Sequence, residues 1–572
     1  MKKWNIQNPS PFTSENTEDL VALLLVNRGI TTAKEKEAFL HPKLEEVTPK
    51  QVGIDNKQLK KTLARITKAI EKKEQIVVFG DYDVDGITGT AILWETLHSM
   101  GANVTPYIPH RIDEGYGLSI PGITNVTSQF VETSLIITVD NGIVAHDAVT
   151  FANQQGIDVI ITDHHTSDEK VPEAYSIVHT TNLCGAGVAY LLSKELTHPN
   201  PPLSGREHTS SSPDKGRLGG VSDTHLELAT LGTVADLVPL TGANRAIVKY
   251  GLEKVCKSKR PGLQELYKQA GIVKDAFEVY EIGYVIAPRL NAAGRIESAM
   301  DSLRLLCTTN RERAQMLAEQ LELTNKDRQQ LMKQATQHAI LGVQTQASKI
   351  KNILFVAHES YLPGVIGLVA GKLVEEFYRP AIVIALGEKQ SKASVRSIKG
   401  FNIIEFLRSH SSHFINVGGH PMAAGFTVET AKVTVLQEAL ETSAEQLLNE
   451  SDFVRNLPID TELPFPMITK QLYKAIKQLA PFGMGNPEPV FATKDVTIAN
   501  FRIIGKEGNH LRLNLQQGKK EFEAIAFGMG ELAKDMKIGD HIDLAYTIDE
   551  NTWNGNTKLQ LKVRDLIQVS NL

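Results

Sequence analysis

Residues 75–86 read QIVVFGDYDVDG, and this stretch decides the fold class of the chain. Its first five residues form an apolar run typical of a short buried strand, and residues 87–100 repeat apolar side chains at helical spacing. Asp81, Asp83 and Asp85 therefore stand at a strand-to-helix turn. Carboxylates so close together repel one another unless a cation lies among them. For such a motif in isolation, a solvated acidic turn that caps the helix is the alternative.

The chain beyond this turn alternates between strands and helices. We expect strands at 75–79, 103–108, 134–139 and 157–161, and helices at 86–101, 143–156 and 186–196. This order predicts an α/β domain with a mostly parallel sheet, in which ligands bind beyond the carboxyl ends of the strands. Asp140 follows the third expected strand, and Asp163, His164 and His165 follow the fourth, so polar side chains recur at strand ends.

Three ligand-bearing strand ends that converge on one crevice predict a metal site rather than a coincidence of turns. Carboxylates with imidazole suit Mn²⁺ or Mg²⁺. Two such ions about 3.5–4 Å apart can clamp a phosphoryl transfer and acidify water, so that no serine or cysteine nucleophile is required. Asp140 is the expected bridging ligand. Asp236, within the apolar segment 232–240, is a further candidate ligand, with a helix-end hydrogen bond as the alternative.

The composition indicates a multidomain globular protein. The chain has 572 residues, 42% apolar and 22% charged, and a formal net charge of −5. That charge does not indicate nucleic-acid binding, although a local basic channel can coexist with acidic metal ligands. Its three cysteines are widely spaced, and we find neither a signal-peptide core nor an apolar stretch long enough to span a membrane. We therefore expect a cytoplasmic protein without a membrane association.

The pattern of the chain predicts five regions in order. They are an N-terminal helical extension at 1–70, a catalytic α/β domain at 71–296 with a flexible insertion at 197–221, a connecting helix at 297–347, a second and smaller α/β domain at 348–452, and a β-barrel of OB type at 453–572. Short alternating runs with intervening turns are the basis for the barrel. The connecting helix is expected to break near 308–310.

Four motifs carry a resemblance to a known family. In chain order they are GDYDVDG at 80–86, the aspartate that ends a strand at 140, TDHH at 162–165 and TVADLVPL at 233–240. They resemble the motifs of the DHH phosphoesterase superfamily, and the form DYDxDG resembles its RecJ branch of single-strand-specific DNA exonucleases. The resemblance implies one metal held by Asp83, Asp140, His164 and Asp236, a second held by Asp81 and Asp140, and His165 beside the scissile phosphate. Asp85 is either a further ligand or a support of the turn.

The same resemblance implies a set of substrate contacts. For the substrate phosphates they are Arg111, Arg289, Arg295, Ser394, Arg396, Gly418, Gly419 and His420. Ser394 and Arg396 match a pocket for the DNA 5′ end, and Gly418 and Gly419 would let a phosphate approach the backbone closely. A structural ion pair is the alternative for any single arginine, and a tight turn with a buried histidine is the alternative at His420.

The C-terminal region offers nucleic-acid contacts of its own. The segments PFGMGNPEP at 481–489 and GKEGNHLRL at 505–513 resemble the OB domain of the RecJ branch. Such domains bind single strands through basic grooves and aromatic stacking. The candidates are Arg502, Lys506, Arg512, Phe527 and Trp553. Because barrel cores also contain aromatic residues, a core position is the alternative for the aromatic candidates.

The implied function is a Mn²⁺- or Mg²⁺-dependent exonuclease that degrades single-stranded DNA from 5′ to 3′ into mononucleotides, in recombination and repair. The resemblance also implies a monomer that works with single-strand-binding protein and a helicase. One alternative is a DHH phosphodiesterase for short oligoribonucleotides or cyclic dinucleotides, but so small a substrate does not need an OB-type tail. Another is an inactive DNA-binding scaffold, which would not need the full ligand set.

Overall fold

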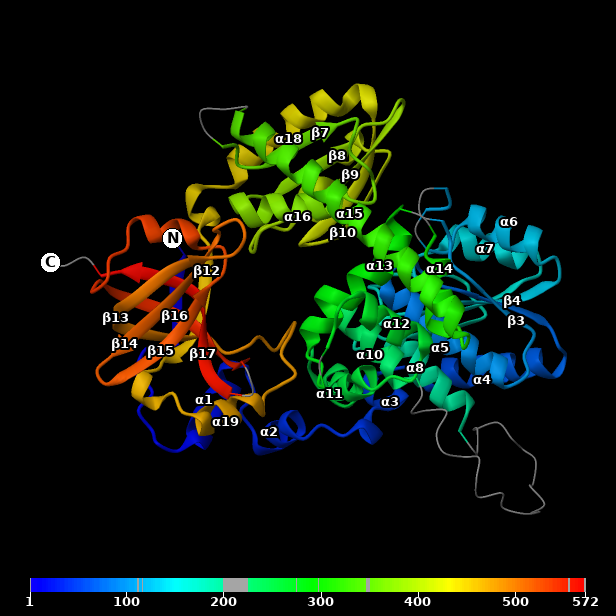
Figure 1. The fold of residues 1–572 in the computed structure, drawn as a ribbon. Coiled ribbons are helices and arrows are strands. Elements are labelled where there is room, and N and C mark those ends of the chain that lie inside the picture. Colours follow the sequence, from blue (N-terminus) through cyan, green and yellow to red (C-terminus); the bar gives the residue numbers. More distant parts are fainter. Residues whose placement is uncertain are drawn as a thin grey trace, which may run out of the picture. The chain divides into compact units, whose positions relative to one another are not determined.

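The computed structural model describes residues 2–110, 113–115, 117–198, 225–273, 275–296, 298–345, 350–553 and 556–569 (Figure 1). The chain forms two compact units. The larger unit comprises residues 45–238 and 250–454, and the smaller comprises residues 1–44, 239–249 and 455–572. Most of the insertion expected at 197–221 lies outside the described residues, as does Arg111.

The catalytic part of the larger unit is built on a five-stranded parallel sheet with the order β3-β2-β4-β5-β6. Its strands are β2 (Gln75–Phe79), β3 (Val104–Tyr107), β4 (Thr133–Thr138), β5 (Asp158–Asp163) and β6 (Ser176–His179). The central strands are apolar on both faces because helices cover both faces. Val77, Phe79 and Ile136 face α6 (Ile120–Gln129) and α7 (His146–Gln154).

The other face of this sheet packs against α4 (Asn56–Glu71), α5 (Val84–Ser99) and α8 (Gly185–Leu196) (Figure 1). Further helices precede and follow these elements in the chain. They are η1 (Leu44–Glu46), α3 (Pro49–Val52), α10 (Leu226–Ala235), α11 (Gly242–Cys256), α12 (Pro261–Gln269), the π-helix η2 (Glu281–Ile286), α13 (Ala287–Ile296) and α14 (Met300–Cys307). The connecting helix α15 (Arg311–Thr345) begins after the expected break at 308–310.

The second part of the larger unit is a mixed sheet with the order β10-β11-β9-β8-β7. Only β7 and β8 pair in parallel. The elements are β7 (Leu354–His358), α16 (Ile366–Phe377), β8 (Ala381–Ala385), β9 (Gln390–Arg396), α17 (Ile403–Arg408), η3 (Ser411–His413), β10 (Asn416–His420), β11 (Ala423–Glu429), η4 (Thr430–Lys432), α18 (Val433–Leu447) and η5 (Glu450–Phe453).

The smaller unit contains a closed five-stranded barrel, β13-β14-β15-β17-β16, in which β13 also pairs with β16. Its elements are β12 (Asn456–Glu462), η6 (Phe465–Met467), α19 (Lys470–Lys477), β13 (Phe491–Ile504), β14 (His510–Gln517), β15 (Lys520–Ala526), η7 (Gly530–Lys534), β16 (His541–Trp553) and β17 (Asn556–Gln568). An expected α/β chain that ends in an OB-type barrel is thus confirmed.

The helical extension expected at 1–70 begins with a strand and not with a helix. Residues Lys3–Asn8 form strand β1, which pairs in parallel with β12, and only then do α1 (Thr17–Asn27) and α2 (Ala33–Leu40) follow. Trp4 and Ile6 alternate with polar residues and pack near Ile459, which is the two-residue period of a half-buried strand. Among the described residues, no helix is long and apolar enough to cross a membrane.

Candidate metal centre and substrate site

The acidic turn joins β2 to α5 as the sequence predicts. Asp83 is the N-cap residue of α5, and its side chain accepts a hydrogen bond from the Gly86 N–H at 3.1 Å. Gly86 permits this turn, because a Cβ at that position would lie 2.6–2.7 Å from backbone atoms of Asp81. The Asp81 side chain is buried, and Asp83 is partly buried. The two carboxylates therefore point into the protein and not into bulk water.

Asp140 lies just beyond β4 in a left-handed backbone conformation, with φ at 63°. A non-glycine residue pays about 1–3 kcal/mol for such a conformation, and it persists where the surroundings impose it. The residue is 2% exposed. Asp140 Oδ1 lies 3.0 Å from His164 Nε2 and 3.9 Å from His165 Nδ1. The strain thus places a buried carboxylate directly beside both histidines.

The two histidines differ in how they are held. His165 Nδ1 lies 2.8 Å from Asp163 Oδ1, which also accepts hydrogen bonds from the backbone N–H groups of His164 and His165. The other oxygen of Asp163 accepts from the Ile143 N–H at 2.9 Å. His164 Nε2 instead faces carboxylates, with Asp236 Oδ2 at 3.5 Å in addition to Asp140. Asp163 therefore orients His165, whereas His164 presents a ring nitrogen to the acidic cluster.

Three overlapping groups of side chains have ligand atoms within 4.8 Å of one another. They are Asp81 with Asp83 and Asp140, Asp140 with His164 and His165, and Asp85 with His164 and Asp236. Within the described part of the chain, Asp140 Oδ1, His164 Nε2 and Asp236 Oδ2 are buried atoms that lack a hydrogen-bond partner. Buried polar atoms are rarely left so, and carboxylate with imidazole is the donor set of a Mn²⁺ or Mg²⁺ site. The residues therefore fit a divalent-metal centre.

The pKa shifts within the cluster also indicate a site for a cation. Burial, followed by repulsion from Asp85 and Asp83, raises the pKa of Asp140 well above its usual value and that of Asp236 to about 9. Burial lowers the pKa of His164. Burial also opposes a charge on His165, but its hydrogen bond to Asp163 outweighs this and raises the pKa of His165. Charged carboxylates are thus unfavourable here unless a cation is bound.

Asp85 supports the structure around the cluster. Its buried carboxylate accepts hydrogen bonds from the backbone N–H groups of Gly185, at 2.6 Å, and Ala186, at 2.8 Å. These N–H groups belong to the first turn of α8, where a negative charge is stabilising. Asp85 Oδ2 also lies 3.8 Å from His164 Nε2. Both of its oxygens are thus engaged by α8, which supports the expected alternative of a structural role.

Helix α13 contacts the acidic turn and carries the two arginines that are expected to bind phosphate. Asn291 Oδ1 accepts a hydrogen bond from the Val84 N–H at 3.0 Å, so α13 holds the start of α5. Arg295 Nη1 donates to the Gly364 carbonyl at 3.2 Å. Arg289 is paired with Glu322 at 2.7 Å and donates to the Val285 carbonyl. The structural ion pair that was the alternative for these arginines is therefore present at Arg289.

Ser394 and Arg396 lie two residues apart on β9, so both side chains leave the same face. Arg396 Nη1 lies 3.4 Å from Ser394 Oγ. Gly367, in the first turn of α16, lies against both, because a Cβ there would be 2.9 Å from Ser394 Oγ and 3.2 Å from Arg396 Nη2. A hydroxyl and a guanidinium thus meet beside the beginning of a helix, a setting suited to an anion.

The glycine-rich segment lies on β10, at the edge of the mixed sheet. Gly418 is exposed, with nothing within 4 Å of where its Cβ would be, whereas Gly419 has φ at 144° and packs tightly against Ala424. His420 is exposed, so the alternative of a buried histidine is wrong. Its ring stacks toward that of His165, with centroids 6.5 Å apart and planes at 18°. The structure therefore brings His420 to the metal cluster.

The barrel candidates divide by environment. Arg512 pairs with Glu523 and lies opposite Arg502 across β13 and β14. Arg502 and Lys506 are exposed. Phe527 is 58% exposed and makes an edge contact with His510. The side chain of Trp553 lies outside the described residues, so that contact stays a prediction.

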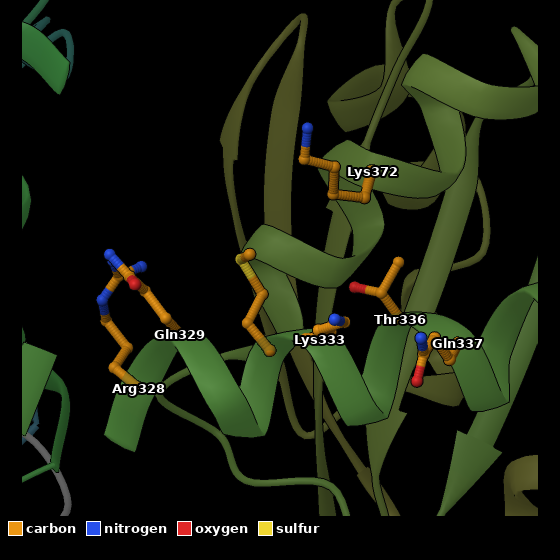
Figure 2. Close-up of a pocket in the computed structure, with 7 residues that line it drawn as sticks. Arg328, Gln329, Lys333, Thr336, Gln337 and Lys372 are labelled. Atoms are coloured by element: carbon orange, nitrogen blue, oxygen red, sulfur yellow. The ribbon is translucent and has the colours of Figure 1, made fainter. Parts of the chain in front are cut away.

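A separate cavity of about 450 Å³ lies between α15 and α16 (Figure 2). Arg328, Lys333 and Lys372 line it together with Thr336 and two glutamines, and of these only Lys372 lies on α16 (Figure 2). None of the carboxylates of the acidic cluster lines this cavity. It is a basic surface feature and not the metal centre.

Two contributing residues were absent from the predicted site. In the sequence, Asp163 stands at the end of a strand without a role of its own, and Asn291 lies between Arg289 and Arg295, for which phosphate contacts are expected. Both act through other residues, since one holds His165 and the other holds the turn. The position of Asp163 directly before the histidine pair was the only sequence signal available for either.

Three family models match the chain. They are the DHH family N-terminal domain at residues 75–211, the DHHA1 domain at residues 349–449 and the RecJ OB domain at residues 459–565. The first contains the acidic turn, Asp140 and the histidine pair. The second contains Ser394, Arg396 and the segment around His420, and the third contains the closed barrel.

Full-length relatives agree with these matches. The chain is 36% identical to the single-stranded-DNA-specific exonuclease RecJ of Bacillus subtilis, over 98% of this chain and 70% of the relative. Its identity to the RecJ of Thermus thermophilus is 34%, over 91% of this chain and 73% of the relative. The crystal structure of the latter protein in complex with Mn²⁺ superposes with a TM-score of 0.81 at 30% identity, covering 100% of this chain and 80% of that one. The chain belongs to the RecJ family of the DHH phosphoesterases.

Proposed function

We propose that this protein is a divalent-metal-dependent exonuclease that hydrolyses single-stranded DNA. The observation that carries the proposal is the buried cluster of carboxylates around His164. Among the described residues, Asp140 Oδ1, His164 Nε2 and Asp236 Oδ2 in this cluster lack hydrogen-bond partners. Relatives with this domain order are named single-stranded-DNA-specific exonucleases. A Thermus relative has been crystallised with Mn²⁺ and with Mg²⁺.

The ligand set that we assign to two Mn²⁺ or Mg²⁺ ions consists of Asp81, Asp83, Asp140, His164 and Asp236. When bound, such a pair of ions activates water and offsets the charge on the phosphate oxygens. Asp140 belongs to two of the three ligand groups, so we assign it as the bridging carboxylate. This assignment explains why the chain tolerates a strained backbone and a buried acid at one position.

His165 and His420 have a separate task. Asp163 holds His165 through Nδ1 and favours its protonated form, so His165 can donate to a phosphate oxygen through Nε2. His420 lies across from it and can donate to the same group. Two imidazoles that converge beside the acidic cluster would position the scissile phosphate and partly neutralise its charge.

We further propose that degradation runs from 5′ to 3′ and releases mononucleotides. Ser394, Arg396 and the beginning of α16 form an anion site that suits a terminal phosphate. Binding of the strand end there would set both the polarity and the product length. As further proposals we assign Arg111, Arg289 and Arg295 to phosphates along the strand, and Arg502, Lys506, Arg512 and Trp553 to the barrel's contacts with it. We also propose a cytoplasmic monomer that cooperates with single-strand-binding protein and a helicase.

The test compares substrates and variants in Mn²⁺. Single-stranded DNA labelled at either end, duplex DNA and a dinucleotide are each incubated with the wild-type protein, with Asp83→Ala and with Asp140→Ala. We expect 5′-to-3′ loss of the single strand by the wild type alone. Preference for the dinucleotide would favour a DHH phosphodiesterase for small substrates, and binding without hydrolysis would favour a scaffold.

A further inference from the structure

An exposed aromatic pair lies on the helix that leads to the metal centre. Tyr280 and Tyr284 are 60% and 73% exposed, and their rings stack with centroids 5.2 Å apart and planes at 22°. Two large aromatic rings that both face solvent contribute little to the stability of the fold. They instead offer a flat π surface of the kind on which nucleic-acid bases stack.

The backbone beneath the pair is unusual. Residues 281–286 form a π-helix, and such segments occur often at functional sites. Its inward side chains, Glu281, Ile282 and Ile286, are buried and anchor the segment. The anchored face leaves both tyrosines on the opposite, solvent side. The local structure therefore presents the rings on a rigid helix and not on a loop.

Two observations link this segment to the elements that carry the acidic cluster. A Cβ at Gly283 would lie 3.8 Å from a side-chain atom of Val234, which is two residues before Asp236. The π-helix also continues directly into α13, where Asn291 holds the Val84 N–H of the acidic turn. At 1.5 Å of rise per residue, Tyr284 lies roughly 10 Å along the axis from Asn291.

The chain next to Asp236 extends the apolar surface. Leu237 follows Asp236 with φ at 60° and is 63% exposed. Leu237 and the tyrosine pair are therefore exposed large side chains on two segments that pack against each other through Val234 and Gly283. A substrate with alternating phosphates and flat bases would use the acidic cluster and the rings together.

We propose that Tyr280 and Tyr284 are a base-stacking platform that positions single-stranded DNA next to the metal centre. This inference rests on the proposed function. The ligand is the base portion of a single strand, and stacking requires no particular sequence because every base has a π face. Duplex DNA would not bind this way, since its bases are already stacked on one another.

The test uses two double variants and two oligonucleotides. Tyr280→Ala with Tyr284→Ala should weaken binding of fluorescent single-stranded DNA in EDTA by about 5- to 30-fold, and raise KM more than it lowers kcat in Mn²⁺. Tyr280→Phe with Tyr284→Phe keeps the rings and should bind as the wild type does. Thermal unfolding shows whether the alanine variant is folded, which we expect because alanine favours exposed helix positions.

An oligonucleotide with abasic sites near its 5′ end completes the design. Removal of the bases should weaken binding to the wild type by a similar factor and leave binding to the alanine variant unchanged, because each change removes the same contact. Any of three results would overturn the platform. The alanine variant could bind the intact strand as tightly as the wild type does, or the wild type could bind the abasic strand with full affinity. The third is that the alanine substitutions and the abasic sites each weaken binding and their factors multiply when the two are combined. If the wild type neither binds nor degrades single-stranded DNA, the proposed function itself fails.

Discussion

Replacement of Asp236 by asparagine should stabilise the metal-free protein and weaken the stabilisation that metal provides. In the folded apoprotein the pKa of Asp236 is about 9, raised by burial and then by Asp85 and Asp83. An unfolded aspartate titrates near 3.9. The pKa of Asp236 is thus higher in the folded than in the unfolded protein. As the pH rises from the unfolded pKa toward the folded pKa, Asp236 therefore lowers the free energy of unfolding more and more.

The magnitude follows from that difference. At pH 7.5 the gap to the unfolded pKa is about 3.6 units, which at 1.36 kcal/mol per unit gives a ceiling of about 5 kcal/mol. Asp236→Asn removes the titration but keeps the size of the side chain. Asp85 and Asp83 share the repulsion with Asp236, so only part of this ceiling belongs to Asp236. We therefore expect the free energy of unfolding to rise by about 2 kcal/mol. For a domain of about 200 residues this corresponds to a rise in Tm of roughly 4–8 °C.

The assay is thermal unfolding at pH 7.5 in EDTA and in a series of Mn²⁺ concentrations. Wild-type protein should gain stability with Mn²⁺, since a ligand that binds only the folded state stabilises it. Asp236→Asn should start higher in EDTA and gain much less. Asp168→Asn is the matched control, because this aspartate is exposed and lies outside all three ligand groups. A lower Tm of Asp236→Asn in EDTA, or a full Mn²⁺ response, would refute the reasoning.

Three further outcomes are expected. Asp163→Asn should lower the pKa of His165 and shift the alkaline limb of the kcat profile to lower pH, whereas an unchanged profile would remove Asp163 as its positioning residue. Arg396→Ala should reduce the preference for a 5′-phosphorylated over a 5′-hydroxyl strand by about tenfold, the usual scale for a charged hydrogen bond, and an unaltered ratio would end the end-binding assignment. Glu95 is paired with Arg260 and His225, which lower its pKa to about 2 despite its burial. Its contribution of about 3 kcal/mol to the free energy of unfolding should therefore be lost as the pH falls from 4.5 to 2. In acid unfolding, the stability of Glu95→Gln should depend less steeply on pH in that range, and an equally steep dependence would contradict this role.

The chain order alone determined the fold class and which carboxylate and imidazole side chains meet in one cluster. Asp83, Asp140 and His164 each follow an apolar run. Because parallel strands place their carboxyl ends on one edge of a sheet, the local pattern was enough to predict that these three side chains lie close together. Helix and strand periods are local properties, which is why the expected break at 308–310 also occurs.

Roles that depend on which partner a side chain meets were decided only by the tertiary structure. Asp85 has the same spacing as Asp83, yet its carboxylate binds the first turn of α8, a hundred residues away in the chain. The pairs Arg289 with Glu322 and β1 with β12 also join segments that are separated in the chain. Hydrogen bonds and ion pairs act over a few ångströms in space, and sequence spacing does not reveal those distances for residues far apart in the chain. The stacked tyrosines show it as well, since only burial of their neighbours reveals that both rings face solvent.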